Sequence, residues 1–85
     1  MSYDPFATLL TSDAQRLLRT DLPTPLYHQL FSLLRDRILS GEAGKGARIP
    51  TEFELSAAFK VSRITAKRAL DILAEELRLA QTALN

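Results

Sequence analysis

Residues 49–73, IPTEFELSAAFKVSRITAKRALDIL, decide the fold of this chain. Thr51 followed three residues later by Glu54 is the pattern of a capping box, in which a hydroxyl and a carboxylate bind free amides at the start of a helix. We therefore expect a helix at about residues 52–59. Ser62 is a favourable N-cap residue for a second helix. Two helices joined by so short a connection predict a helix-turn-helix.

The second helix, expected at about residues 63–74, has an apolar face and a basic face. When residues are placed about 100° apart around its axis, one arc is apolar: it contains Ala66, Ala69, Leu70, Leu73 and Leu77. Arg63, Lys67 and Arg68 fall outside this arc, and Ile64 lies among them. Guanine accepts hydrogen bonds from cationic donors, and a thymine methyl group needs an apolar contact. This face therefore suits double-stranded DNA, although a solvated charged surface has the same composition.

Two segments before this stretch have helical patterns. Residues 1–11 are expected to form an irregular arm, and Ser12 with Gln15 predicts a capping box for a short helix near residues 13–19 that buries Leu17 and Leu18. A longer helix is expected from Pro25 to about Ser40, with Gly41 as its left-handed cap. Its core stripe is Leu26, Leu30, Phe31, Leu34 and Ile38.

Two more residues are candidates for contacts with phosphate. Tyr27 lies at the edge of the core stripe, where it either packs or presents its hydroxyl to a phosphate. Arg48, with Lys45 in the same glycine-containing loop, adds positive charge close to the helix-turn-helix.

The composition indicates one small globular domain and excludes some classes of site. The chain has 85 residues, 46% of them hydrophobic, with a net charge of +1 and no cysteine, so it has neither disulfides nor thiolate ligands. His28 is its only histidine, and no carboxylate pair is set in an evident pocket. We therefore expect no enzyme activity, no metal and no cofactor. Since we see neither a signal peptide nor a bilayer-spanning run, a cytoplasmic location is expected.

Five short motifs follow one another along the middle of the chain. They are PLYHQ at residues 25–29, RILSG at 37–41, IPTE at 49–52, VSRIT at 61–65 and ALDIL at 69–73. In this order and spacing they resemble the DNA-binding domain of the GntR family of bacterial transcription regulators. Five linked motifs are a specific signal, whereas any one alone is weak.

The resemblance implies a winged helix-turn-helix that places its second motif helix in the major groove, usually as a homodimer on a palindromic operator. Arg63 matches the family's base-reading arginine. Ser62, Thr65 and Lys67 match positions that contact phosphates or base edges, and Thr51 matches one that anchors the backbone. The family's repressors usually bind a small-molecule effector through a C-terminal domain, which is absent from these residues.

The chain departs from the family pattern at three places. Phe53 stands where many members have an arginine that reaches DNA, so a base contact is expected to be lost or replaced. Lys60 stands where many members have glycine, which costs about 1 kcal/mol if the backbone is left-handed there. The glycine and the β-hairpin wing that usually follow the second helix have no counterpart after Glu76.

The end of the chain leaves two interpretations open. A wing is missing or altered after Glu76, which we favour, or one helix of more than twenty residues continues. In the second case an apolar stripe along residues 66–84 favours pairing with another helix. We thus expect an all-α or mainly α chain with an arm at 1–23, a DNA-binding helix-turn-helix at 24–76 and an extension at 77–85. The alternative function is a helical dimerisation module that uses the 66–84 stripe.

Overall fold

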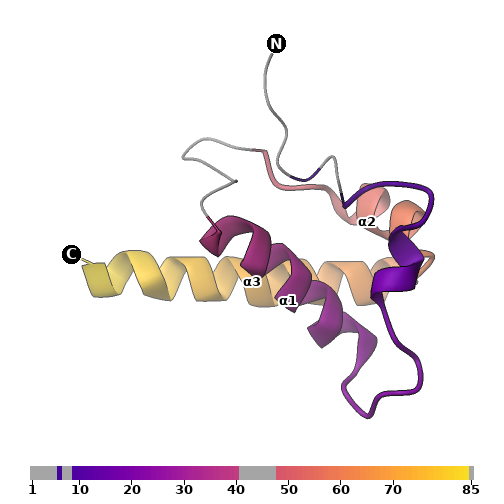
Figure 1. The fold of residues 1–85 in the computed structure, drawn as a ribbon. Helices are drawn as coiled ribbons and strands as arrows, with labels where there is room; N and C mark the ends of the chain where they lie inside the picture. Colours follow the sequence, from indigo (N-terminus) through magenta and orange to yellow (C-terminus); the bar gives the residue numbers. More distant parts are fainter. Residues whose placement is uncertain (1–5, 7–8, 41–47, 85) are drawn as a thin grey trace.

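The computed structural model describes residue 6, residues 9–40 and residues 48–84, the last six of these by their backbone. Four helical elements follow in chain order: the 3-10 helix η1 (Ala14–Leu17), α1 (Leu26–Leu39), α2 (Glu52–Phe59) and α3 (Arg63–Leu84). Helix α3 is the central element, because α1 crosses it and α2 packs near its amino end, while η1 packs on α2 (Figure 1). No strand occurs in these described ranges, so this part of the chain has the expected all-α fold.

The predicted capping box starts α2. The Glu54 amide donates to the Thr51 hydroxyl at 3.1 Å, and the Thr51 amide donates to the Glu54 carboxylate at 3.0 Å. The helix ends at Lys60, whose φ of 58° and ψ of 41° lie in the left-handed region. Its amide still donates to the carbonyl of Ser56. Lys60 thus turns the chain sharply toward α3, at the position where glycine would avoid the clash of Cβ.

The core is built from all the helical elements. Its buried side chains are Phe6, Leu9, Ala14, Leu30, Phe31, Leu34, Leu55, Phe59, Ala66, Ala69 and Leu73. The apolar arc predicted for α3 therefore faces inward, with Leu70 and Leu77 half-buried at its edge. Ala66 and Ala69 are fully covered and small, which allows neighbouring backbones to approach α3 closely. Burying one Phe or Leu side chain contributes about 1.5–3 kcal/mol, so this cluster dominates stability.

The N-terminal segment packs on the domain through Phe6 and Leu9, both in the core cluster. The short helix differs from its prediction. It has only four residues, its N-cap is Asp13 without a side-chain hydrogen bond, and Leu17 is 47% exposed while Ala14 is buried. Leu18, the other residue predicted to be buried, is half-buried and packs against the core. A 3-10 helix has three residues per turn, so its inward face differs from that of an α-helix.

Gln29 joins the segment before α1 to the helix itself. Its side-chain amide donates to the carbonyl oxygens of Arg19 at 2.9 Å and Thr24 at 2.8 Å, and its oxygen accepts from the Arg19 amide at 2.8 Å. In the sequence this glutamine is noticeable only as the last residue of the PLYHQ motif. Its role in the structure is to satisfy backbone groups that would otherwise face solvent.

Helix α1 agrees with its prediction except at its ends. Leu30, Phe31 and Leu34 are buried, as the stripe predicted. Pro25 is the N-cap and not the first helical residue, because its ψ of 147° is extended. The helix ends at Ser40, which is still right-handed, and the predicted cap Gly41 lies outside the described residues.

Helix α3 is longer than the 63–74 segment expected from the sequence. It continues to Leu84 as one helix, and its carboxyl end extends beyond α1 (Figure 1). Residues 63–84 contain neither glycine nor proline and are rich in alanine, leucine, glutamate and arginine, which favour helix. The chain after Glu76 is thus helical through Leu84, as in the second interpretation. No helix in the part of the chain that the structure describes is long and apolar enough to cross a membrane.

Candidate nucleic-acid interface

The amino end of α3 presents a basic and apolar surface to solvent. Arg63, Lys67 and Arg68 are exposed, and Ile64 is 80% exposed, one of the most accessible large apolar residues of the described chain. The prediction that Ile64 points away from the core is confirmed. Its exposed methyl groups lie among cations, a combination that can contact both a thymine methyl group and guanine or phosphate oxygens.

Ser62 and Thr65 hold the first turn of α3 together. The Ser62 hydroxyl accepts from the Thr65 amide at 3.1 Å and donates to the Thr65 hydroxyl at 2.9 Å. The N-cap prediction for Ser62 is confirmed. The helix begins in a defined orientation, and its amino end adds a partial positive charge that favours anions.

Arg63 is paired with an acid from the other motif helix. Its Nη2 donates to Glu52 Oε1 at 2.9 Å, and both side chains remain in contact with solvent. The sequence placed Arg63 on the basic face of this helix and indicated no acidic partner for it. The fold supplies one, because the turn brings the first residue of α2 to the first residue of α3.

Two further cations of the predicted site also have acidic partners. Lys67 Nζ donates to Asp71 at 3.0 Å, and this hydrogen bond together with the negative charge raises the pKa of Lys67. Arg48 donates twice to Glu54, at 2.7 and 3.0 Å. These hydrogen bonds from Arg48, followed by that from the Thr51 amide, lower the pKa of Glu54 to about 2. All these pairs face solvent, where a phosphate can compete for the cation.

Thr51 and Arg48 are therefore linked to the start of α2 through Glu54. The Thr51 hydroxyl already serves as the helix cap, and Arg48 lies against the carboxylate of the same capping box. The Glu52–Arg63 pair separately joins the starts of the two motif helices. Sequence spacing alone did not indicate either set of contacts.

Arg68 and Tyr27 form a cation–π pair between α3 and α1. The guanidinium carbon of Arg68 lies 4.1 Å from the centroid of the Tyr27 ring. The half-buried ring also meets His28 edge-on, with centroids 6.5 Å apart. Tyr27 therefore packs, in agreement with one of its two proposed roles, and it holds Arg68 at the side of α3 that faces α1.

Phe53, which stands where many family members have an arginine that reaches DNA, is a surface residue. It is 66% exposed and follows Glu52, the partner of Arg63. The signal was present in the sequence, since an apolar residue stood at a position outside the core spacing of α2. Phe53 and Ile64 thus give each motif helix one exposed apolar side chain near its start.

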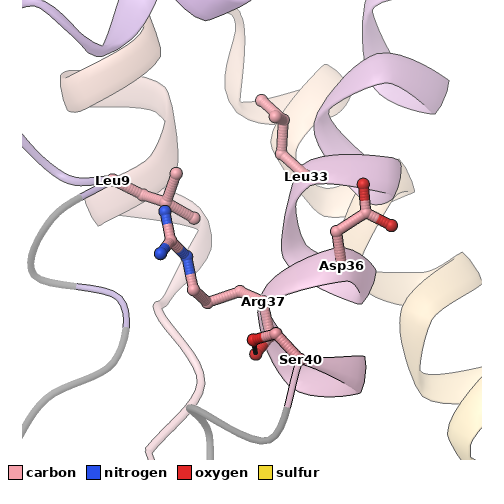
Figure 2. Close-up of a pocket in the computed structure, with 5 residues that line it drawn as sticks. All are labelled: Leu9, Leu33, Asp36, Arg37 and Ser40. Atoms are coloured by element: carbon pink, nitrogen blue, oxygen red, sulfur yellow. Dashed lines mark hydrogen bonds between the residues drawn. The ribbon is translucent and has the colours of Figure 1, made fainter.

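A separate shallow pocket lies between the N-terminal segment and α1. Figure 2 shows its lining residues, Leu9, Leu33, Asp36, Arg37 and Ser40. The pocket has a volume of about 220 Å³. None of these five belongs to α2 or α3, so the pocket is distinct from the surface around Arg63. Within the described residues, no group of three His, Asp or Glu side chains is arranged to hold a metal ion.

Comparisons with known proteins agree with this geometry. The family model described as bacterial regulatory proteins, gntR family, matches residues 26–81, more than half of the chain. An uncharacterized HTH-type transcriptional regulator of Bacillus subtilis, YurK, is 42% identical over 60 residues, which are 71% of this chain and 25% of that protein. The Mannosyl-D-glycerate transport/metabolism system repressor MngR of Escherichia coli is 42% identical over 52 residues, 61% of this chain and 22% of that protein.

A third relative, the HTH-type transcriptional repressor NagR of Bacillus subtilis, is 35% identical over 54 residues, 64% of this chain and 22% of its own length. No solved structure gives a significant match. The matched residues span about a quarter of the length of these relatives. The matched residues include α1, α2 and most of α3, and all four basic residues of the candidate interface, Arg48, Arg63, Lys67 and Arg68, lie within them. The chain belongs to the GntR family of bacterial regulatory proteins and contains its helix-turn-helix DNA-binding domain.

Proposed function

We propose that α3 enters the major groove of a DNA operator and that Arg63 reads a guanine there. The observation that carries this proposal is the exposed amino end of α3, where Arg63, Ile64 and Lys67 lie outside the core arc. A bidentate contact from arginine to guanine N7 and O6 gives about 1–3 kcal/mol of discrimination against other bases. Ile64 is placed to meet a thymine methyl group beside it.

The remaining predicted site residues are proposed to position the helix on the phosphates. Ser62 and Thr65 fix the first turn of α3, whose amino end faces the phosphates, and Lys67 supplies charge one turn later. Arg68, held by Tyr27, and Arg48, held beside Thr51, supply charge on the flanks. Phosphate contacts of this kind fix orientation and make binding sensitive to salt, because counterions are released.

The complete regulator is proposed to be a homodimeric repressor on a palindromic operator, controlled by an effector bound outside these residues. Support comes from the relatives MngR and NagR, which are named as repressors and in which the matched residues make up only 22% of the length. Within the chain, residues 24–76 are the proposed DNA-binding unit, residues 1–23 an arm that packs on it, and residues 77–85 an extension of α3.

A dimerisation module that works through the 66–84 stripe is less well supported. Ala66 and Leu73, two residues of that stripe, are buried in the core of their own domain against α1 and α2. They are therefore not available to a partner helix. No feature of the described residues favours an enzyme, and the named relatives are regulators.

The proposal is tested by fluorescence anisotropy of the 85-residue chain with duplexes selected from a random pool, titrated with salt. We expect selective binding that weakens with salt, and Arg63→Ala should reduce it by about 5- to 150-fold. Arg16→Ala is the matched control, because Arg16 is also an exposed arginine near an acid but lies on η1. An absence of selection at low salt, or equal losses in the two variants, would refute the assignment.

A further inference from the structure

We propose that Glu52 determines specificity by holding the guanidinium of Arg63 in the orientation that reads guanine. This inference rests on the proposed function and adds a positioning residue that makes no base contact itself. It starts from the 2.9 Å hydrogen bond from Arg63 Nη2 to Glu52 Oε1. The bond joins residues 11 positions apart and on different helices, so it follows from the fold and not from helix periodicity.

The geometry leaves Arg63 free to bind a base. A guanidinium has five N–H donors in a planar fork, and a bidentate contact with guanine uses two of them. The bond to Glu52 uses a donor of Nη2 only. One N–H group of the guanidinium is thus bound to Glu52, while its other N–H donors remain for the base.

Glu52 is itself well placed to act as a fixed support. It is the first residue of α2 and directly follows Thr51, the N-cap residue. Its side chain is 35% exposed, compared with 65% for the side chain of Arg63. Leu55 and Phe59 anchor α2 in the core against α3. The carboxylate is therefore carried by a rigid element, whereas the long arginine side chain would otherwise sample many rotamers.

The negative charge of Glu52 has opposite effects on non-specific and on specific binding to DNA. A carboxylate close to the DNA surface repels phosphates, so Glu52 is expected to lower affinity for every duplex. It also makes an encounter of Arg63 with a phosphate less favourable, which opposes non-specific binding. A residue that weakens general binding and favours the correct base contact increases the ratio of specific to non-specific affinity.

The experiment compares wild type, Glu52→Gln and Glu52→Ala on three duplexes by anisotropy. One is the selected duplex, one carries 7-deazaguanine in place of the guanine whose contact Arg63→Ala removes, and one is unrelated in sequence. We expect the ratio of affinities for the first and second duplexes to fall about 2- to 5-fold in Glu52→Ala, the range for losing one exposed ion pair. Affinity for the unrelated duplex should stay equal or rise, because a negative charge is removed.

Glu75→Gln is the matched control. Glu75 is also an exposed acid paired with an arginine, Arg78, at 2.8 Å, but it lies about 18 Å from Arg63 along α3. This variant should leave the ratio unchanged. In the Arg63→Ala background, Glu52→Ala should cause no further loss of discrimination. Far-ultraviolet circular dichroism of each variant shows whether the helices are retained.

Three results separate the two proposals. If the wild type selects a guanine through Arg63 and Glu52→Ala discriminates as well as before, the role of Glu52 is refuted while the DNA-reading role of Arg63 stands. If Glu52→Ala weakens all three duplexes equally, Glu52 is only structural and the inference is likewise refuted. If the wild type selects no sequence, both proposals fall.

Discussion

Replacing Lys60 with glycine should stabilise this domain. Lys60 is the only non-glycine residue of the described chain with a positive φ, 58°, and it is exposed at the end of α2. A left-handed backbone costs an L-residue about 1–2 kcal/mol because Cβ approaches the carbonyl oxygen. Glycine removes this cost but loses about 0.5–1 kcal/mol more conformational entropy on folding. The net expected gain is about 0.5–1 kcal/mol, a Tm increase of about 2–8 °C for a domain of this size.

The assay is thermal and urea unfolding followed by circular dichroism at 222 nm, with Lys60→Ala as the matched control. Alanine removes the same charge and side chain but keeps Cβ, so the left-handed cost remains and no gain is expected. An unchanged or lower Tm in Lys60→Gly would refute the reasoning from backbone strain. An equal gain in Lys60→Ala would show that the charge at the helix end is responsible instead.

Three further predictions concern other contacts. Gln29→Ala should lower the free energy of unfolding by about 1–3 kcal/mol, because three hydrogen bonds to the segment before α1 are lost, and an unchanged urea midpoint would contradict this. Because the folded pKa of Glu54 is lowered to about 2 from an ordinary 4.5, its contribution to stability is present above pH 4.5 and is lost as pH falls toward 2. Urea titrations across that window should show a smaller loss for Glu54→Gln than for wild type; parallel curves would count against the ion pair. Deoxyuridine in place of the thymine that Ile64 meets should weaken wild-type binding about 4-fold, from the loss of one methyl contact, and should not affect Ile64→Ala. Equal effects on both proteins would exclude this contact.

Local sequence signals determined the elements of the helix-turn-helix. Thr51 with Glu54 marked the start of α2, and Ser62 marked the start of α3, because capping depends on side chains within three residues of the amides they bind. The apolar spacing placed Ala66, Ala69 and Leu73 in the core. The same periodicity left Ile64 outside it, as the structure confirms. Five linked motifs indicated the family, which the comparisons confirm.

Contacts between distant residues were decided only by the tertiary structure. The Glu52–Arg63 pair and the Arg68–Tyr27 pair join different helices, and Gln29 binds backbone groups as far as ten residues away. No periodicity predicts such partners, since they depend on how α1 and α2 pack against α3. The burial of Phe6 and Leu9 likewise required the neighbouring elements to cover them. The sequence by itself therefore determined which residues form the basic surface of α3, and the fold determined which acids and rings hold those cations in place.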